Sequence, residues 1–483
     1  MASDLSNPTD LPSPPRPFSL AGKLAFGAGD IGPGMTANLL AFSFLIFLTT
    51  TAGLSPVAAG SVLAIGRVWD AINDPLIGYL SDNTRSRWGR RYPWIALGAL
   101  PFGLTFFLTW IVPGFQSEAA RFWYYVIMSL LFQVFYTVVN LPYTTLTAEL
   151  TKDYDERTEL TAFRLGSSLT GAISALALGL VISNLIQDSR QQYLVLAAVC
   201  SVLSVLPLLW CVIGTYPYAA DRGALQPAAD PNAAENLPFL QQIKIVLSNR
   251  AFLYVVGIYL FAWLALQMTA SVIPFYTTFW MGMESYFLAA LLVQGTAIAM
   301  MVAINWLSRR YGKQEAFYAG IGTWIIAQIA IFLVQPGQVA ALYLLCVVIS
   351  FGVAAAYVVP WAMLPDVIEL DELQTGQRRE GVFYAFMTLL QKVGLAGGLL
   401  LVGYALELSG FVSPDVTQVA GDVIQPDSAL LAIRVFIGPV PMVLLVLALV
   451  LAYFYPITRQ KHEEILLQLA ERHRSQIEPS SDE

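Results

Sequence analysis

The chain has 483 residues, of which 57% are hydrophobic and only 12% are charged, and its mean hydropathy is +0.62. Soluble domains carry about 25% charged residues, so this composition excludes an ordinary soluble globular protein. The net charge is −7, and the acidic residues are concentrated in connections and tails, so the sequence offers no nucleic-acid-binding surface. The hydrophobic composition leaves the lipid bilayer as the environment of the chain.

Residues 1–22 are polar and proline-rich, without the basic-then-apolar order of a signal peptide, and we expect a disordered cytoplasmic leader. Stretches long enough to cross a bilayer, which takes roughly 20 residues, then recur along the chain. Because they do not alternate apolar and polar residues as barrel strands do, we expect transmembrane helices. The twelve expected spans are 24–50, 56–81, 93–113, 120–147, 161–186, 191–215, 250–279, 286–308, 315–335, 338–365, 381–408 and 428–455.

Basic residues are unevenly distributed over the connections between these spans. With a cytoplasmic N-terminus, the outside connections hold only Arg121, Arg190 and Arg434. The inside connections hold Arg85, Arg87, Arg90, Arg91, Lys152, Arg157, Arg222, Lys244, Arg309, Arg310, Lys313, Arg378 and Arg379. This asymmetry predicts that both termini are cytoplasmic, in a plasma or inner membrane.

The two halves of the chain repeat. RWGR at 87–90 recurs as RYGK at 310–313, an offset of 310 − 87 = 223, and the Pro142 and Pro360 motifs LPYTTLTAEL and VPWAMLPDVIEL lie 360 − 142 = 218 apart. Two similar offsets predict a duplicated six-helix unit with the substrate site between the halves. The expected segments are 23–215 and 249–456 for the halves, 216–248 for a central cytoplasmic loop, and 457–483 for a cytoplasmic tail with a short amphipathic helix.

Six ionisable residues lie inside apolar stretches, where charges are costly and usually functional. They are Asp30, Arg67, Asp70, Asp74, Arg164 and Lys392. Three are acidic and three are basic, so the set can neutralise itself.

The second span carries Arg67, Asp70 and Asp74 at spacings i, i+3 and i+7, which place all three on one helix face. Two carboxylates four residues apart can supply several oxygens to one hard cation, and Na+ is the candidate ion here. Pro75 lacks an N–H, so the carbonyl of Ala71 is released toward such an ion. The structural alternative is that Arg67 pairs with both acids to hold helices together, and the functional alternative is that a proton takes the place of sodium.

The other buried charges allow two interpretations each. Lys392 either extends to the membrane interface or bridges the two halves; because it lies deep in the eleventh span, we expect it to bridge the halves toward the second-span acids. Arg164 lies near the start of the fifth span, where it either serves the site or extends to the interface. Asp30, in the glycine-rich opening of the first span, is either a cavity residue or an interfacial cap.

A charged cytoplasmic loop follows the second span. Its charges either only fix the orientation of the chain in the membrane or also form a latch that holds the halves together in one state. Its expected gate residues, with two from the second half, are Asp82, Arg85, Arg87, Arg90, Arg91, Arg378 and Arg379. Tyr143 and Trp361 flank the repeated prolines and are candidates for the cavity, as is Trp263. We find no nucleophile–base pair, metal cluster or phosphate loop, and expect neither an enzyme nor a cofactor.

Three long segments and the ending YPITRQKHEEI resemble the glycoside–pentoside–hexuronide:cation symporters, in the branch of the melibiose permeases. The segments are RVWDAINDPLIGYLSDNTRSRWGRRYPW, PYTTLTAELTKDYDERTELTAFR and PWAMLPDVIELDELQTGQRREGVFYAF. The resemblance covers nearly the whole chain. It implies an all-α major facilitator fold with 12 transmembrane helices in two six-helix halves, and a carrier coupled to Na+, H+ or Li+.

The resemblance also assigns individual residues. It places the cation site at Asp70, Asn73, Asp74 and Thr137, with Asn140 where melibiose permeases have a further aspartate. By the same resemblance, the basic residues of the family are matched here by Arg67, Arg164 and Lys392. The sugar-binding aspartate and the stacking aromatic of melibiose permeases are replaced by Gly34 and Thr144, and Asp30 is the acid that can substitute.

We therefore expect a cation-coupled symporter of a sugar or glycoside that works by alternating access as a single copy. The alternative substrate is a lysophospholipid or another amphiphile, because an animal branch of the resembled family carries lysophospholipids. A non-transporting sensor on the same fold is a weaker alternative, since a sensor has no need of paired membrane carboxylates.

Overall fold

The computed structural model describes residues 17–223, 225, 239–377, 379–413 and 423–477, and all regular elements in these ranges are helical. The first half contains α1 (Leu20–Ala28), α2 (Ile31–Leu39), η1 (Leu40–Phe44), η2 (Phe47–Thr51), α3 (Pro56–Asp82), α4 (Tyr92–Leu108), α5 (Glu118–Leu150), α6 (Tyr154–Leu185) and α7 (Ser189–Asp221). The second half follows α8 (Phe239–Ser248) and contains α9 (Arg250–Phe275), η3 (Tyr276–Trp280), α10 (Phe287–Tyr311), α11 (Lys313–Leu333), α12 (Val339–Thr375), α13 (Glu380–Leu408), α14 (Asp427–Ile437) and α15 (Pro439–Phe454). The last helix is α16 (Arg459–Ile477).

Ten helical spans in the described residues are long and apolar enough to cross a membrane. Two further helices, α3 and α4, complete the twelve that the sequence predicts. The helix α4 has only 17 residues, and α3 carries Arg67, Asp70 and Asp74, whose charges lower its mean hydropathy. The low hydropathy of α3 points to a functional role for its charges, because ionisable residues in membrane-spanning helices are costly and usually functional.

The first and last predicted spans are each interrupted. Gly29 and Asp30 separate α1 from α2, and Gly438 separates α14 from α15. The first long helix of each half ends in a π-helical turn, η2 or η3, and Gly53 or Gly282 follows with φ of 68° or 66°. Backbone at positive φ suits glycine because a Cβ is strained there. The same ending in both halves extends the repeat from sequence to backbone geometry.

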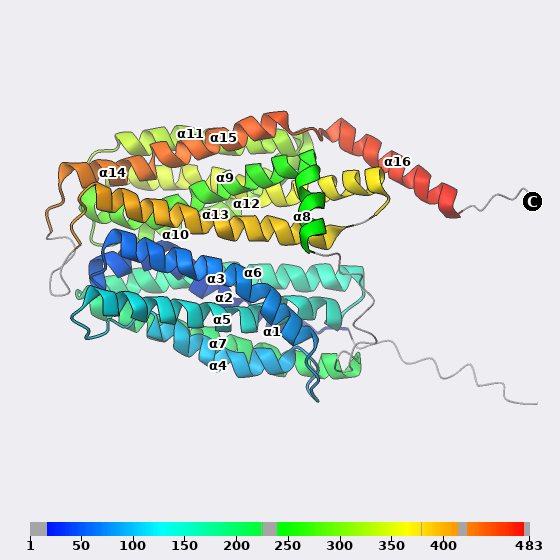
Figure 1. The fold of residues 1–483 in the computed structure, drawn as a ribbon, viewed down its shortest axis with the longest axis horizontal. Coiled ribbons are helices and arrows are strands. Elements are labelled where there is room, and N and C mark those ends of the chain that lie inside the picture. The colour runs from blue at the N-terminus through cyan, green and yellow to red at the C-terminus, as the bar shows by residue number, and fades with distance from the viewer. Residues whose placement is uncertain (1–16, 224, 226–238, 378, 414–422, 478–483) are drawn as a thin grey trace, which may run out of the picture.

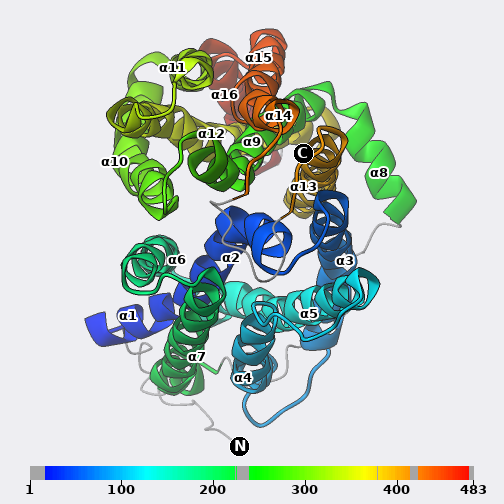
Figure 2. The same ribbon diagram turned by 90° about the vertical axis from the view of Figure 1, so that its left-hand side faces the viewer.

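The two halves stand side by side with their helices nearly along one direction (Figure 1). Helices α1–α7 form one half and α9–α15 the other, as the end-on view shows (Figure 2). Helix α8 runs across the direction of the bundle, and α16 extends beyond the end of it (Figure 1).

The halves meet most extensively where α3 packs against α13, and also where α6 packs against α10 and η1 against α9. A Cβ added to Gly403 on α13 would lie 2.5 Å from the carbonyl oxygen of Pro56. A Cβ added to Gly179 on α6 would lie 2.3 Å from the ring of Phe287. Small residues allow helices to approach closely in membranes, so these glycines set how near the halves come.

Hydrogen bonds join the halves at the end of the bundle where α3 begins and α13 ends, which we call the contact end. The Val57 N–H donates to a carboxylate oxygen of Glu407 over 2.9 Å, and the hydroxyls of Tyr193 and Tyr286 lie 3.2 Å apart. At the opposite end, no hydrogen bond or ion pair joins described residues of α1–α7 to described residues of α9–α16. Among the described residues, the hydrogen bonds between the halves therefore lie at the contact end and in the middle of the bundle.

Candidate functional site

The two acids of α3 share one ammonium group from the other half. The Nζ of Lys392, on α13, lies 2.9 Å from Oδ2 of Asp70 and 2.5 Å from Oδ2 of Asp74. The side chain of Asp70 is 7% exposed and that of Asp74 is 39% exposed, so Asp70 is buried and Asp74 is partly exposed. This contact joins the halves in the middle of the membrane-spanning helices.

Polar oxygens from α5 complete the surroundings of the acids. The hydroxyl of Thr137 lies 3.1 Å from Oδ1 of Asp74 and 3.4 Å from Oδ1 of Asp70. Asn73 is buried and donates from Nδ2 to the carbonyl of Gln133 over 3.3 Å. Asn140 is half-buried on the same helix as Thr137 and has no hydrogen bond with another described side chain. Carboxylate and hydroxyl oxygens of this kind suit a hard monovalent cation or a proton.

Arg67 does not join this cluster. It forms no ion pair in the part of the chain that the structure describes, although the sequence offered Asp70 and Asp74 as its partners. Its side chain instead lines a small cavity of about 30 Å³ between the halves, together with Gln133 of α5 and Gln267 of α9. A polar cavity of this size has room for water beside Arg67.

Asp30 and Arg164 form a second, looser pair within the first half. Asp30 lies at the break between α1 and α2, and its Oδ2 is 3.9 Å from Nε of Arg164 on α6. The Nε of Arg164 is buried and makes no hydrogen bond. The structure therefore brings these two together and keeps them apart from the Asp70–Asp74–Lys392 cluster.

The aromatic candidates occupy different surroundings. Tyr143 is fully buried and donates its hydroxyl to the carbonyl of Phe26 over 2.8 Å, so it packs α5 against α1 and does not line a cavity. Trp361 and Trp263 are half-buried in the second half, and both rings contact Tyr259, at centroid distances of 5.5 Å and 5.7 Å. They belong to an aromatic wall on α9 and α12.

The positions of the melibiose-type sugar contacts are used for packing. A Cβ added to Gly34 would lie 2.3 Å from the backbone oxygen of Ser168, because α2 lies directly against α6 there. The hydroxyl of Thr144 donates to the carbonyl of Leu141 on its own helix over 2.9 Å. No side chain longer than that of glycine fits at position 34 while these helices stay in place.

We predict that Gly34→Ala destabilises the protein by about 1–3 kcal/mol, the usual effect of overpacking. The matched control is Gly166→Ala on α6, where nothing lies within 4 Å of an added Cβ. Alanine favours a helix over glycine by roughly 0.5–1 kcal/mol, so the control should be as stable as the parent protein or more so. Thermal unfolding of the purified proteins compares them, and equal midpoints for the two variants would disprove the close packing of α2 on α6.

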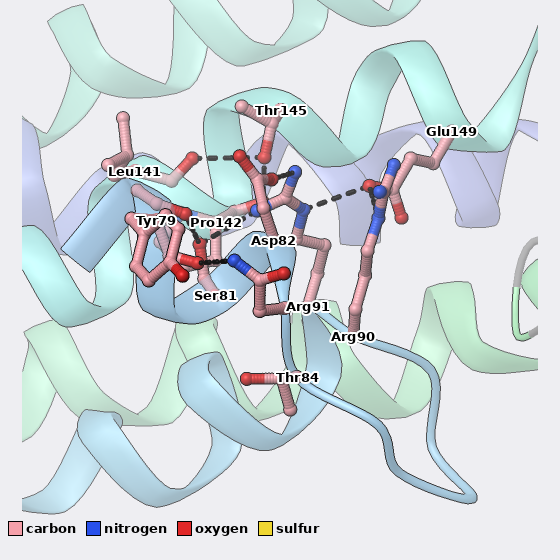
Figure 3. A network of polar contacts seen from close by, with 12 residues as sticks. Tyr79, Ser81, Asp82, Thr84, Arg90, Arg91, Leu141, Pro142, Thr145 and Glu149 are labelled. Atoms are coloured by element: carbon pink, nitrogen blue, oxygen red, sulfur yellow. Dashed lines mark hydrogen bonds and ion pairs between the residues drawn. The ribbon is translucent and has the colours of Figure 1, made fainter. Parts of the chain in front are cut away.

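The gate residues of the first half form a network within that half (Figure 3). Arg91 is buried and contacts Asp82, the Ser81 hydroxyl at 2.8 Å and Glu149 at 2.8 Å, and Arg90 lies 2.7 Å from the same Glu149 oxygen. This network ties the end of α3 and the start of α4 to α5. Arg85 and Arg87 are exposed and make no ion pair with any described residue.

The gate residues expected from the second half make no such network. Arg379 donates to the side-chain oxygen of Gln377, at 2.8 Å and 3.0 Å, and Arg378 lies outside the described residues. The equivalent contact comes from Lys313, whose Nζ lies 2.6 Å from Asp366 and 2.7 Å from the carbonyl of Ala362.

Sequence reasoning did not single out Glu149 or the pairing of Lys313 with Asp366. A signal for both was present, because each basic residue lies in the repeated RWGR or RYGK motif or next to it, and each acid lies in a repeated proline motif. The two repeated motifs of each half therefore meet in space. No sequence signal marked Glu407 or the Tyr193–Tyr286 contact, which depend on how the halves dock.

Known proteins are similar to the chain in sequence and in architecture. The chain matches the family model described as MFS/sugar transport protein over residues 25–459. An uncharacterized symporter of Synechocystis sp. is 43% identical and is aligned over 93% of this chain and 96% of its own. Sodium-dependent lysophosphatidylcholine symporter 1 of Xenopus tropicalis is 28% identical over 95% of this chain and 91% of its own.

Among solved structures, the inward-open xylose transporter XylE from E. coli superimposes with a TM-score of 0.56. It is 14% identical, with 93% of this chain and 97% of XylE covered. The likeness confirms the predicted all-α major facilitator fold of an integral, multi-pass membrane protein. The narrower resemblance to melibiose permeases stays a prediction.

Proposed function

The chain belongs to the MFS/sugar transport protein family, and on that basis we propose that it is a secondary active symporter driven by Na+ or H+. The observation that carries this proposal is the Lys392 ammonium held by both Asp70 and Asp74. An ammonium bound between two carboxylates and near the hydroxyl of Thr137 marks where a cation is held. A coupling ion that binds there displaces Lys392 and thereby breaks a contact between the halves.

The proposed mechanism is alternating access. The ion neutralises the two acids, Lys392 is released, and substrate binds between the halves before the loaded carrier rocks to its other state. Hydrogen bonds at the contact end, such as Val57 to Glu407, must break in that step. Coupling requires that ion and substrate each favour the binding of the other by the same factor.

The proposed orientation has both termini in the cytoplasm, following the distribution of basic residues. The end of the bundle opposite the contact end, where α1 begins and α16 projects, then faces inward, and the proposed conformation is inward-facing. Asp82, Arg90 and Arg91 belong to the inner gate, with Arg85, Arg87, Arg378 and Arg379 as the charges available to latch the halves when that gate closes. Labelling of either terminus from outside intact cells would rule this orientation out.

Two substrate classes are compatible with the site. A sugar or glycoside is supported by the family description and by the aromatic wall of Trp263 and Trp361, since aromatic faces suit sugar rings. A lysophospholipid or similar amphiphile is supported by relatives named as lysophosphatidylcholine symporters. The packing around Gly34 and Thr144 argues against the melibiose type of sugar site in particular.

We predict that melibiose is not a substrate, because position 34 has no room for an acid that would hold it. The experiment is binding to the purified protein of melibiose, other sugars and lysophospholipids, each with Na+ or with choline replacing Na+. Na+ or acid pH should strengthen binding of the true substrate class. Concentrative uptake of melibiose would refute the prediction, and a panel in which no ligand responds to either ion would count against symport itself.

A further inference from the structure

The charges of the central region balance before a coupling ion binds. Asp30, Asp70 and Asp74 supply three negative charges, and three positive charges come from Arg67, Arg164 and Lys392. Within the described residues, Lys392 pairs with two of the acids and Arg164 with the third. Of the three bases, Arg67 is the one without an acid partner among the described residues.

A coupling ion upsets this balance. Whether Na+ or a proton binds at Asp70 and Asp74, the six groups together with the ion carry one net positive charge. Lys392 then loses its partners, so two cationic groups, Lys392 and Arg67, border the interface between the halves. An uncompensated charge in a membrane interior is unfavourable, and the carrier must enclose this charge when it changes state.

Arg67 borders the cavity between the halves, where a compensating group can approach it. Both halves line it, with Gln133 from α5 and Gln267 from α9, and Arg67 lies one helical turn from Asp70. A guanidinium presents paired N–H donors that match the two oxygens of a carboxylate or phosphate, and the two amide side chains add further donors.

We propose that the substrate carries one net negative charge on a carboxylate or phosphate group, and that Arg67 binds this group. This inference rests on the proposed symport function and deepens it. It explains why the ion and the substrate need each other, since each supplies the charge that the other leaves unbalanced. A lipid headgroup and a sugar acid share this chemistry and are the two sources to separate.

The test uses two pairs of ligands that differ in charge on the same body. Methyl glucuronide is compared with methyl glucoside, and lysophosphatidylglycerol, a phosphodiester with one negative charge, with the monoacylglycerol of the same acyl chain. Binding to the purified protein is measured with Na+, with choline replacing Na+, and at acid pH. In at least one pair, the anionic member should bind at least about tenfold more tightly than the neutral one when the coupling ion is present, as expected for a charge-assisted contact.

Arg67→Gln should remove that preference, while the stabilisation of the protein by the ion alone persists and shows that the fold and the ion site are intact. Arg309→Gln, which removes an exposed arginine from the end of α10, should keep the preference. Equal binding within both pairs, binding of neither anion, or an unchanged preference in Arg67→Gln would overturn the inference. In those cases an ion response that persists leaves the symport proposal standing, whereas its absence in wild type defeats that proposal too.

Discussion

Asp70→Asn and Asp74→Asn should each abolish concentrative uptake while leaving the protein folded. Asparagine keeps the size of the side chain and removes a charge that is costly in the membrane, so folding is preserved. One remaining acid, already held by Lys392, cannot attract and neutralise a coupling ion. Typical coupling energies are about 1–3 kcal/mol, so substrate affinity in the presence of the ion should fall roughly 5- to 150-fold toward its ion-free value.

Substrate titrations on wild type and both variants, with Na+ and pH varied separately, measure this effect. Asp155→Asn is the matched control, because Asp155 is an exposed acid at the start of α6 and should keep wild-type uptake. Full uphill uptake with unchanged ion dependence in either variant would remove that acid from the ion site. The acids would then be structural partners of Lys392 alone.

Lys392→Gln should tighten ion binding, which is the opposite of the effect of the two asparagine substitutions. It should abolish concentrative uptake, as they do. Without the ammonium, Asp70 and Asp74 face each other uncompensated, and breaking a buried pair in this way costs about 3–5 kcal/mol. Asp74 is 39% exposed, so we expect the lower end of that range or less. A coupling ion no longer competes with Lys392 and binds more tightly, but it releases no contact between the halves, so it no longer promotes substrate binding.

The measurement is thermal stability against Na+ concentration and against pH. An ion at 100 times its Kd adds about 2.7 kcal/mol of stability, so the variant should gain more from the ion than wild type does at the same concentration. Lys461→Gln, at an exposed lysine of α16, should respond as wild type. An identical ion response in Lys392→Gln and wild type would show that Lys392 does not compete for the site.

Much of the ion site could be read along the chain because it lies on one helix. The spacing of Asp70 and Asp74 places both on one face of α3 whatever the other helices do. The partner of these acids depends on packing. Arg67 is the nearest base in sequence, yet Lys392 contacts both acids, although it lies 318 residues from Asp74 and 392 − 70 = 322 residues from Asp70. Whether Arg67 or Lys392 pairs with the two acids depends on how α13 packs against α3. The spacing of residues along one helix does not predict that packing.

The other features of the fold also divide into those that the sequence predicts and those that depend on packing. Twelve spans followed from hydropathy, and the duplicated halves followed from two repeated motifs. The interruptions at Asp30 and Gly438 did not, because a short break leaves the mean hydropathy of a span unchanged. The packing role of Tyr143 was also missed, since a buried tyrosine and a cavity tyrosine look alike in sequence. The contact end has no local signature, because its hydrogen bonds join residues from different halves.

The central claim is that Asp70 and Asp74 hold the coupling ion in place of Lys392. The most direct test is equilibrium binding of radioactive Na+ to purified wild type, Asp70→Asn, Asp74→Asn and Lys392→Gln, with proton uptake measured in parallel. We predict one saturable ion in wild type, tighter binding in Lys392→Gln, and loss of binding in both asparagine variants; if protons are the coupling ion, proton uptake follows the same pattern. Saturable ion binding of unchanged affinity in both asparagine variants would contradict the account.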